Sequence, residues 1–231
     1  MIGLQILKRH RCIDASLVQA FHGLPVANIS DSMSRMTAGG AGLRPMHKAG
    51  YLSGPALTVK TRPGDNLMIH KAIALAQPGD VIVVDGGGDL SNALIGELMV
   101  TTAKRRGVAG FVMNGAIRDL DMIAAGDFPV FAAGVTHRGP YKDGPGEINV
   151  PVAIDGMVIH PGDLVVGDAD GVLCVPIDQA PIILEATQAK GVAERKTLQQ
   201  IAEGTLDVAW IDATLKRIGC DPYCALTPCR R

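Results

Sequence analysis

The sequence predicts an α/β fold in which short buried strands and amphipathic helices share one domain. Short β-branched runs such as VIVV and GVLCV are bounded by glycine, proline and aspartate, which is typical of strands. Longer segments between them carry apolar residues at helical spacing and begin with polar capping residues. The strands outnumber those of a simple strand–helix alternation, so we expect strand pairing beyond a βαβ repeat.

The N-terminal part is predicted to be helical. DASLVQAFHGL has a helical apolar pattern after a cap at Asp14 or Ser16. ANISDSMSRM follows, with Asn28 or Ser30 as a second cap. A glycine-rich loop over residues 37–47 then ends the helical region.

Strands dominate the next part of the chain. Their β-branched runs start and stop at turn residues, as buried strands do. Six segments are predicted to hold them, residues 52–61, 80–86, 107–113, 128–134, 147–159 and 163–176.

Three further helices complete the expected elements. One covers residues 66–76, and a second covers 91–107 with a cap at Ser91 or Asn92. The second is closed by basic residues and a glycine, which suit a helix C-terminus. The last and longest covers residues 177–204.

Composition limits the classes of function. The chain has 231 residues, of which 47% are hydrophobic and 19% charged, so we expect a large core and buried subunit interfaces. Its apolar runs are far shorter than the ~20 residues of a membrane span. A net charge of −1 and three tyrosines give little support to nucleic-acid binding. The N-terminus has no signal-peptide pattern, which predicts a cytoplasmic protein.

The five cysteines predict reduced thiols, since the count is odd and no secretory signal is present. Three of them, Cys220, Cys224 and Cys229, lie in the tail. A metal clip there would lack a paired C-x2-C and a fourth ligand. An incidental tail is therefore favoured over a zinc site.

Two segments could carry chemistry. Gly86–Gly88 follows an apolar strand and could offer amides to an anion, although a plain turn is favoured. Arg118 and Asp119 follow another strand. A guanidinium can hold a carboxylate in a bidentate fork, and a carboxylate is a hard ligand for Mg²⁺ or Mn²⁺. These two functions suit a 2-oxo acid, whereas the alternative is a surface ion pair or a helix cap at Asp119.

Other catalytic patterns are missing from the sequence. The six histidines show no H-E-x-x-H or similar spacing, so a zinc site is not expected. The chain has no G-x-S-x-G elbow, and nothing marks a cysteine or lysine as a nucleophile.

Three segments together resemble one known family. They are GELM at 96–99, GVAGFVMNGAIRD at 107–119, and the run from GVTHRGPYKDG to GVLCVP at 134–176. They resemble regulator of ribonuclease activity A-like (RraA-like) proteins, which include class II 4-hydroxy-4-methyl-2-oxoglutarate/4-carboxy-4-hydroxy-2-oxoadipate aldolases. The resemblance extends from about residue 20 to residue 210.

The resemblance implies a swivelling β/β/α domain that forms homotrimers or homohexamers, with active sites between subunits. The single domain would cover residues 1–231, with a core at about 20–210 and a cysteine-containing tail at 219–231. The functional helix would then start near residue 96 rather than at Ser91. Four residues at that start would bind pyruvate through their backbone, namely Gly96, Glu97, Leu98 and Met99.

The same resemblance assigns roles to side chains. Arg118 matches the arginine that grips the pyruvate carboxylate, and Asp119 matches the ligand of a divalent metal, Mg²⁺ or Mn²⁺. Glu194 is expected to be the glutamate from an adjacent subunit that faces the metal's water shell. One departure lies at Met122, where the family pattern has an acidic residue; Asp121 precedes it.

We therefore expect a metal-dependent aldolase that cleaves a 4-hydroxy-2-oxo acid to pyruvate and a second 2-oxo acid. The metal and Arg118 would stabilise the enolate, and a metal-associated or Glu97-oriented water would protonate it. Oxaloacetate would be decarboxylated as a side reaction. A ribonuclease regulator without chemistry and a lyase for another oxo acid remain alternatives. The loop THRGPYKDG could form the distal substrate pocket, with His137, Arg138, Tyr141 and Lys142, although a solvated turn is favoured.

Overall fold

The computed structural model describes residues 2–36 and 41–220. The chain divides into two compact units, residues 1–188 and 189–231, and each is described by itself. The expected single domain stays a prediction. Residues 37–40 of the predicted glycine-rich loop lie outside the described residues.

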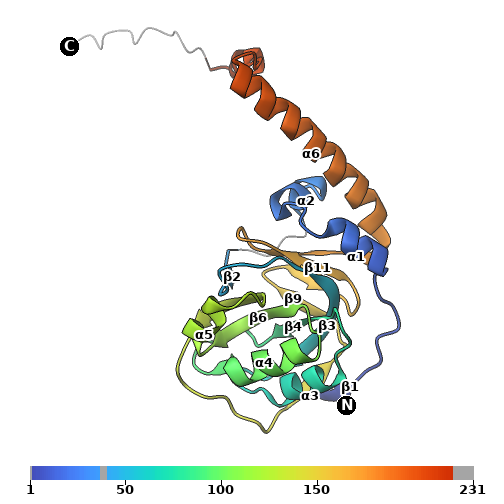
Figure 1. Cartoon of the computed structure of the whole chain (residues 1–231), viewed down its shortest axis with the longest axis vertical. Helices are drawn as coiled ribbons and strands as arrows, with labels where there is room; N and C mark the ends of the chain where they lie inside the picture. The colour runs from blue at the N-terminus through green and yellow to red at the C-terminus, as the bar shows by residue number, and fades with distance from the viewer. Residues whose placement is uncertain (1, 37–40, 221–231) are drawn as a thin grey trace, which may run out of the picture. The chain divides into compact units, whose positions relative to one another are not determined.

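A mixed ten-stranded sheet forms the centre of the first unit (Figure 1). The middle of its main path, made of β3, β4, β6 and β7, is parallel. Strand β8 joins β3 and strand β2 joins β7 in antiparallel orientation, and the edge strand β1 pairs with β8 in parallel. In sheet order the strands are β1 (Leu4–Ile6), β8 (Gly146–Ile148), β3 (Leu52–Thr61), β4 (Val81–Asp85), β6 (Gly110–Ile117), β7 (Val130–Val135) and β2 (Arg44–Pro45).

Further strands extend this sheet at its sides. Strand β5 (Ala93–Ile95) pairs with the end of β6, and β11 (Leu164–Gly167) pairs with both β3 and β12 (Val172–Val175). A separate hairpin joins β9 (Val152–Ile154) to β10 (Met157–Ile159). These pairings are the extra strands that the sequence predicted beyond a βαβ repeat.

Two apolar cores lie on opposite faces of the sheet because successive strand residues point to opposite sides. In β4, Val81 and Val83 enter one core, whereas Ile82 and Val84 enter the other. Helices α1 (Ala15–Phe21) and α2 (Val26–Ser32) cover the first face. Helices α3 (Leu67–Leu75) and α4 (Glu97–Arg105) cover the second, as Figure 1 shows.

The structure confirms the α/β class and corrects several boundaries. Asp14 caps α1 and accepts a hydrogen bond from Ser16 N, whereas α2 begins after Pro25 rather than at Asn28 or Ser30. Proline suits this boundary because its fixed φ matches a helix entry and it needs no hydrogen-bond partner for an N–H. The helix predicted from residue 91 begins at Glu97, because the residues before it form β5.

Besides β5, three other short elements of the first unit were not predicted from the sequence. Strand β1 and strand β2 lie in segments predicted as helix and loop, and α5 (Leu120–Ala125) lies in a segment predicted as loop. The N-terminal helical prediction is therefore wrong at Leu4–Ile6, where the chain pairs with β8 instead. The two strands depend on pairing with distant segments rather than on local periodicity, and α5 is too short to show a clear periodic pattern.

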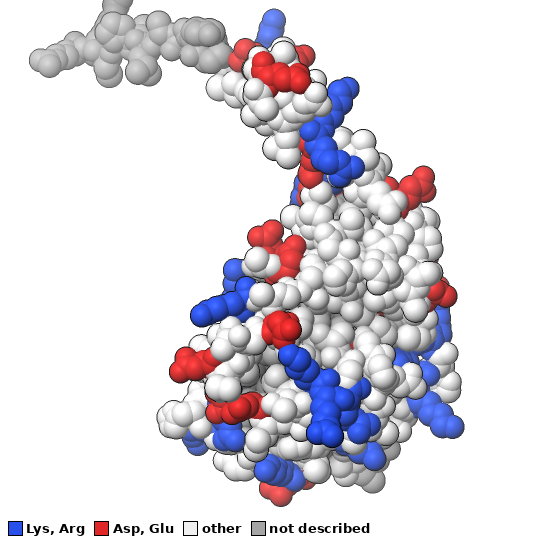
Figure 2. All heavy atoms as spheres, in the orientation of Figure 1, with Lys and Arg blue, Asp and Glu red and all other residues white. Residues whose placement is uncertain are grey.

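Helix α6 (Ala180–Glu203), after the short turn η1 (Ile177–Gln179), confirms the last predicted helix. Its first residues belong to the first unit, and the second unit continues with α7 (Ala209–Arg217). Among the described residues, every helix is too short or too polar to span a bilayer. On the face in Figure 2, acidic and basic side chains are interspersed.

Candidate active site

The candidate site lies where the parallel strands end. Arg118 and Asp119 directly follow β6, and the Arg118 amide donates a hydrogen bond of 3.0 Å to Ile95 O at the end of β5. Ligands of open α/β sheets commonly bind beyond the carboxyl ends of their parallel strands. The strand order therefore brings this pair to the first turn of α4.

Asp119 is held in an unusual conformation. Its φ of 58° and ψ of 41° place it in the left-handed region, which aspartate tolerates better than most residues. It caps α5, and its Oδ2 accepts a hydrogen bond of 2.9 Å from Glu97 N. Asp119 thus occupies the N-cap position of α5, but its side chain makes no capping hydrogen bond there and instead accepts one from the first residue of α4.

Gly96 makes this approach possible. A Cβ at this position would collide with Asp119 Oδ2 and would lie 2.9 Å from Arg118 Cγ. Any side chain would therefore force the pair away from the helix start. Glycine is therefore required at position 96 by the lack of space for a Cβ, and not by its backbone φ, which is in the extended region.

Arg118 and Asp119 only partly neutralise each other. Arg118 Nε lies 3.8 Å from Asp119 Oδ2, and their side chains are 43% and 42% exposed. A bidentate pair would have two shorter contacts between terminal nitrogens and both oxygens. The two terminal guanidinium nitrogens and Asp119 Oδ1 therefore remain outside this ion pair.

A pocket of about 110 Å³ adjoins the pair. Pro140 and Lys142 reach it from the loop after β7, and His70 reaches it from α3. Burial and the nearby Lys142 charge lower the pKa of His70 below its usual value. The complete lining comprises Asn66, His70, Ala93, Leu94, Ile95, Gly96, Leu98, Met99, Arg118, Asp119, Pro140 and Lys142.

One buried polar atom in this wall lacks a partner. Asn66 is 2% exposed, and its Nδ2 donates to Leu94 O at 2.9 Å, which fixes the amide orientation because a carbonyl can only accept. Asn66 Oδ1 then has no hydrogen-bond partner among the described residues. An unsatisfied buried acceptor costs about 1–3 kcal/mol, so a donor from a ligand or water would be stabilising here.

The predicted site residues do not all meet in this pocket. Gly96, Leu98 and Met99 line it, but Glu97 lines a neighbouring hollow of about 380 Å³ together with Met122. Met122 is 56% exposed there. The side chain of Glu97 and the departure at residue 122 thus share a hollow beside the pair.

Glu194 lies in the second unit, on α6. Lys190 Nζ is 3.6 Å from Glu194 Oε1, one helical turn away. The predicted role of Glu194 concerns a neighbouring subunit, so it stays a prediction.

The glycine loop does not form the anion site that the sequence allowed. Gly86 N and Gly88 N donate to Asn114 O, and Gly87 N donates to Asp85 Oδ1. The loop leads to β5 rather than directly into a helix. The favoured reading, a plain turn, is confirmed because its amides are already satisfied.

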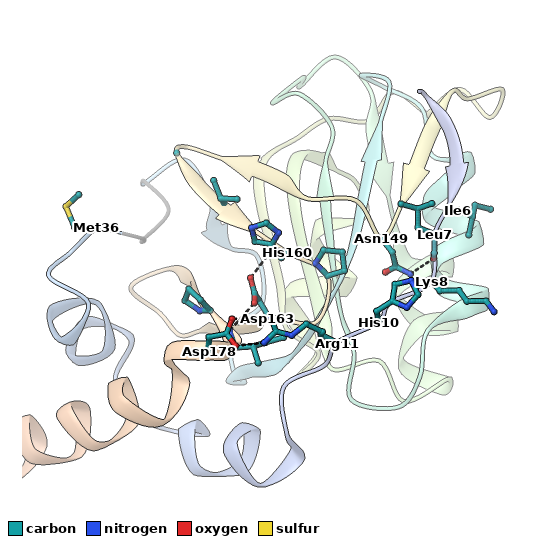
Figure 3. A pocket seen from close by; sticks show the side chains of 15 residues that line it. Ile6, Leu7, Lys8, His10, Arg11, Met36, Asn149, His160, Asp163 and Asp178 are labelled. Carbon is teal, nitrogen blue, oxygen red and sulfur yellow. Dashed lines mark hydrogen bonds and ion pairs between the residues drawn. The ribbon is translucent and has the colours of Figure 1, made fainter. Parts of the chain in front are cut away.

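A larger pocket of about 870 Å³ lies between the N-terminal segment and the turns near His160 and Asp178 (Figure 3). Its guanidinium, Arg11, is bound through Nη1 and Nη2 to both carboxylate oxygens of Asp178. Asn149 lines the same pocket, and its Nδ2 donates to Leu7 O. By volume alone this pocket would be the candidate active site. The incompletely paired Arg118 and Asp119 instead favour the smaller pocket.

Comparisons with known proteins decide the family. The family model described as RraA-like, aldolase/RraA, matches residues 26–174. The chain belongs to the RraA-like family. A relative from Halalkalibacterium halodurans, named "Putative 4-hydroxy-4-methyl-2-oxoglutarate aldolase", is 37% identical over 195 residues, which are 84% of this chain and 93% of that protein.

Solved structures of similar chains share the fold. Streptomyces coelicolor RraAS2, described as an unusual member of the RNase ES inhibitor RraA family, has a TM-score of 0.74 at 27% identity over 81% of this chain and 98% of that one. A Pseudomonas syringae protein has a TM-score of 0.77 at 26% identity over 85% and 97% of the two chains. The RraA-like family thus contains both aldolase and inhibitor names.

The family's aldolase name implies a metal, and of the candidate site residues Asp119 could supply one carboxylate ligand. No group of three His, Cys, Asp or Glu side chains converges among the described residues. Mg²⁺ commonly uses one or two carboxylates and fills its other positions with water and substrate oxygens. The outward-facing carboxylate of Asp119, half of which is outside the contacts with Glu97 and Arg118, suits such a site.

Sequence reasoning missed Asn66 and His70 as pocket residues. Both lie at the start of α3, directly after β3, so they come to the same sheet edge as the residues after β6 and β7. The only signal in the sequence was their position just after a predicted strand.

Proposed function

We propose that the chain is a divalent-metal-dependent lyase that cleaves a 4-hydroxy-2-oxo acid to pyruvate and a second 2-oxo acid. The observation that carries the proposal is the incomplete Arg118–Asp119 pair at the start of α4, beside a polar pocket. The RraA-like family and its aldolase-named relative support the same reaction.

Arg118 would bind the carboxylate of the pyruvate half. Its two terminal nitrogens lie outside the Nε contact with Asp119, so a bidentate contact with a carboxylate is available to them. A guanidinium stays charged at any working pH, so this contact would persist throughout the reaction.

The first turn of α4 would hold the opposite side of the substrate. Glu97 N is engaged by Asp119, and Met99 N donates to Gly96 O at 3.1 Å. The Leu98 amide is therefore our candidate donor to a substrate oxygen.

Asp119 would hold Mg²⁺ or Mn²⁺, which supplies a positive charge near the 2-oxo group when bound. In the reaction, a water takes the proton of the 4-hydroxyl, and the C4–O bond becomes a carbonyl. The C3–C4 bond breaks, and its electron pair forms the enolate of pyruvate. Arg118 keeps the carboxylate of that enolate in place until C3 is protonated.

Glu97 would orient the water that returns the proton to C3. Glu194 of a neighbouring subunit would complete the water shell, so the site would need a homotrimer or homohexamer. The size of the pocket agrees with this requirement, since about 110 Å³ is below the ~300–1,000 Å³ of usual ligand pockets.

The test is pyruvate release from 4-hydroxy-4-methyl-2-oxoglutarate and from oxaloacetate, each with Mg²⁺ and with a chelator. We expect metal-dependent release from both, because decarboxylation of oxaloacetate passes through the same enolate. Release from oxaloacetate alone would keep the enolate site but indicate another physiological acid. Release from neither, by a folded protein, would reject the proposal.

The second candidate is a protein regulator of a ribonuclease. The similarity to Streptomyces coelicolor RraAS2 favours it. An inhibitor has no need of an arginine and an aspartate poised over a polar pocket, so we favour the lyase. Binding of a ribonuclease without pyruvate release would reverse that order.

A further inference from the structure

The pocket of about 870 Å³ lies away from the candidate active site, toward the other end of the parallel strands. Asp163 lines this pocket, and its backbone oxygen accepts a hydrogen bond of 2.8 Å from Ala56 N. Ala56 lies beside Val81, the first residue of β4, whereas Arg118 follows the last residue of β6. A ligand in this pocket would therefore be separate from a substrate bound to Arg118.

One wall of the pocket is the N-terminal segment, residues 6–11, which is held in place at two points. Asn149 Nδ2 donates to Leu7 O at 2.9 Å, and Arg9 Nη1 forms an ion pair of 2.6 Å with the buried Asp80. A wall fixed in this way keeps its shape without a ligand, which reduces the entropy that binding must spend on ordering it.

The facing wall contains two carboxylates, and both are already engaged (Figure 3). Asp163 is 5% exposed, and its two oxygens accept hydrogen bonds from His160 N at 2.9 Å and from Ile177 N at 3.1 Å. The Asp178 carboxylate is bound by Arg11. Neither carboxylate therefore leaves a free negative charge for a cationic ligand.

The remaining polar groups of the pocket are a lysine and two histidines. Within residues 2–36 and 41–220, the Lys8 ammonium has no ion pair or hydrogen bond, and neither have the imidazole rings of His10 and His160. A lysine is charged at neutral pH, and an imidazole carries an N–H donor in either of its protonation states. The charge that the pocket leaves without a partner is thus positive.

Apolar side chains complete the lining. Ile6, Leu7 and Val158 are 47%, 45% and 54% exposed, and all three line this pocket. Exposed apolar side chains that gather with polar groups around them are typical of interaction sites. The volume of about 870 Å³ lies within the ~300–1,000 Å³ of usual small-molecule sites, so a small ligand fits this concave surface.

We propose that this pocket is a second ligand site, which binds an alkyl or aryl carboxylate. The carboxylate would lie on the Lys8 ammonium, with His10 as a further donor, and the apolar body would pack against Leu7 and Val158. The N-terminal wall precedes residues 26–174, which the family model matches, so it lies outside the family pattern. The site is separate from the proposed lyase reaction and does not depend on it.

The test measures the binding of octanoate to the full chain by isothermal titration calorimetry, in the presence of Mg²⁺. Acetate carries the same anion without the apolar body, and 1-octanol carries the apolar body without the charge. We expect saturable binding of about one octanoate per chain, at least ~10-fold tighter than that of either comparison molecule. No saturable binding of octanoate, or equal binding of 1-octanol, would overturn the proposal.

Lys8→Met tests the position of the carboxylate. It should weaken octanoate binding about 10- to 100-fold, the range for losing one charge-assisted hydrogen bond, and leave 1-octanol binding within about two-fold because methionine keeps an apolar stem. Lys48→Met, at an exposed lysine outside the pocket, is the matched control and should change neither. An equal loss of octanoate and 1-octanol affinity in Lys8→Met would overturn the assigned role of Lys8.

Arg118→Ala separates the two pockets. It should bind octanoate as wild type does, because Arg118 lies in the smaller pocket and not in this one. Loss of octanoate binding in Arg118→Ala, together with unchanged binding in Lys8→Met, would place the carboxylate in the candidate active site and overturn the second ligand site.

Discussion

Two pockets of the first unit each contain an arginine and an aspartate, and they differ in how the two side chains meet. In the larger pocket, both terminal nitrogens of Arg11 bind both oxygens of Asp178. In the smaller one, the closest approach is that of Arg118 Nε to Asp119 Oδ2, at 3.8 Å, which is longer than a hydrogen bond, and Asp119 also accepts from Glu97 N. In the first pair the two charged groups bind each other completely, whereas in the second both groups can still bind a ligand.

The geometry of an arginine–aspartate pair is therefore a better indicator of an active site than the volume or the composition of the pocket around it. The larger pocket holds about 870 Å³, but its arginine is already paired with Asp178. The smaller holds about 110 Å³ but places an incompletely paired cation, an incompletely paired anion and the unsatisfied Asn66 Oδ1 together. Three variants test whether the two pairs differ in this way.

Asp119→Asn should have the largest effect. Asparagine tolerates the left-handed backbone and can still accept from Glu97 N, so the fold should be retained. The loss of a hard anionic ligand should abolish the response of pyruvate release to Mg²⁺, measured as rate against metal concentration. An unchanged dependence of the rate on Mg²⁺ concentration would show that Asp119 is not a metal ligand.

Gly96→Ala should have an intermediate effect. The new Cβ would push against Asp119 Oδ2 and Arg118 Cγ, so the pair must move away from α4. We expect kcat/KM to fall at least ~10-fold, since misplacing a catalytic group by about 1 Å can cost on the order of 100-fold. Gly191→Ala, at a helical glycine of the second unit, is the control. Equal activity of Gly96→Ala and wild type would show that the close approach is dispensable.

Arg11→Ala should have the smallest effect, because exposed ion pairs contribute little. Its hydrogen bonds and charge lower the pKa of Asp178 below the usual value. A carboxyl with a lowered folded pKa contributes stability above its unfolded pKa and loses it as the pH falls through the folded value. The small difference in melting temperature between Arg11→Ala and wild type should therefore begin to shrink as the pH falls below about 4 and should disappear once the pH is below the lowered pKa of Asp178. A difference that grew in acid would contradict this pairing.

The sequence predicted the fold class because that depends on local patterns, whereas the roles of Arg118 and Asp119 came from the family resemblance and stay a proposal. Runs such as Val81–Asp85 and the long helix α6 carry their periodicity within themselves. Strand β1 could not be predicted, since its three residues form a strand only by pairing with β8, far along the chain.

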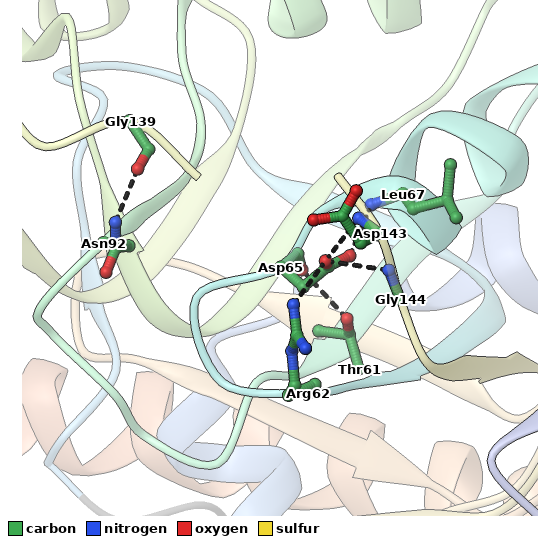
Figure 4. A network of polar contacts seen from close by, with 8 residues as sticks. All are labelled: Thr61, Arg62, Asp65, Leu67, Asn92, Gly139, Asp143 and Gly144. Carbon is green, nitrogen blue, oxygen red and sulfur yellow. Dashed lines mark hydrogen bonds and ion pairs between the residues drawn. The ribbon is translucent and has the colours of Figure 1, made fainter. Parts of the chain in front are cut away.

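The rest of the candidate pocket also depends on tertiary structure. Asn66, His70 and Lys142 come from segments after β3 and β7, and only the strand order brings them to the residues after β6. The sequence favoured a solvated turn for the loop that contains Lys142. The buried Asp65 accepts hydrogen bonds from Asp143 N and Gly144 N of this loop (Figure 4), but nothing in the sequence distinguishes it from an ordinary turn aspartate.

The role of Arg118 as the substrate-binding arginine is tested by pyruvate release from 4-hydroxy-4-methyl-2-oxoglutarate, with Mg²⁺, measured for wild type, Arg118→Ala and Arg11→Ala side by side. We predict release by wild type, nearly equal release by Arg11→Ala, and a loss of at least ~100-fold in kcat/KM for Arg118→Ala, as expected when a bidentate charge-assisted contact is removed. Retention of wild-type kcat/KM by Arg118→Ala, or an equal loss in both variants, would contradict it.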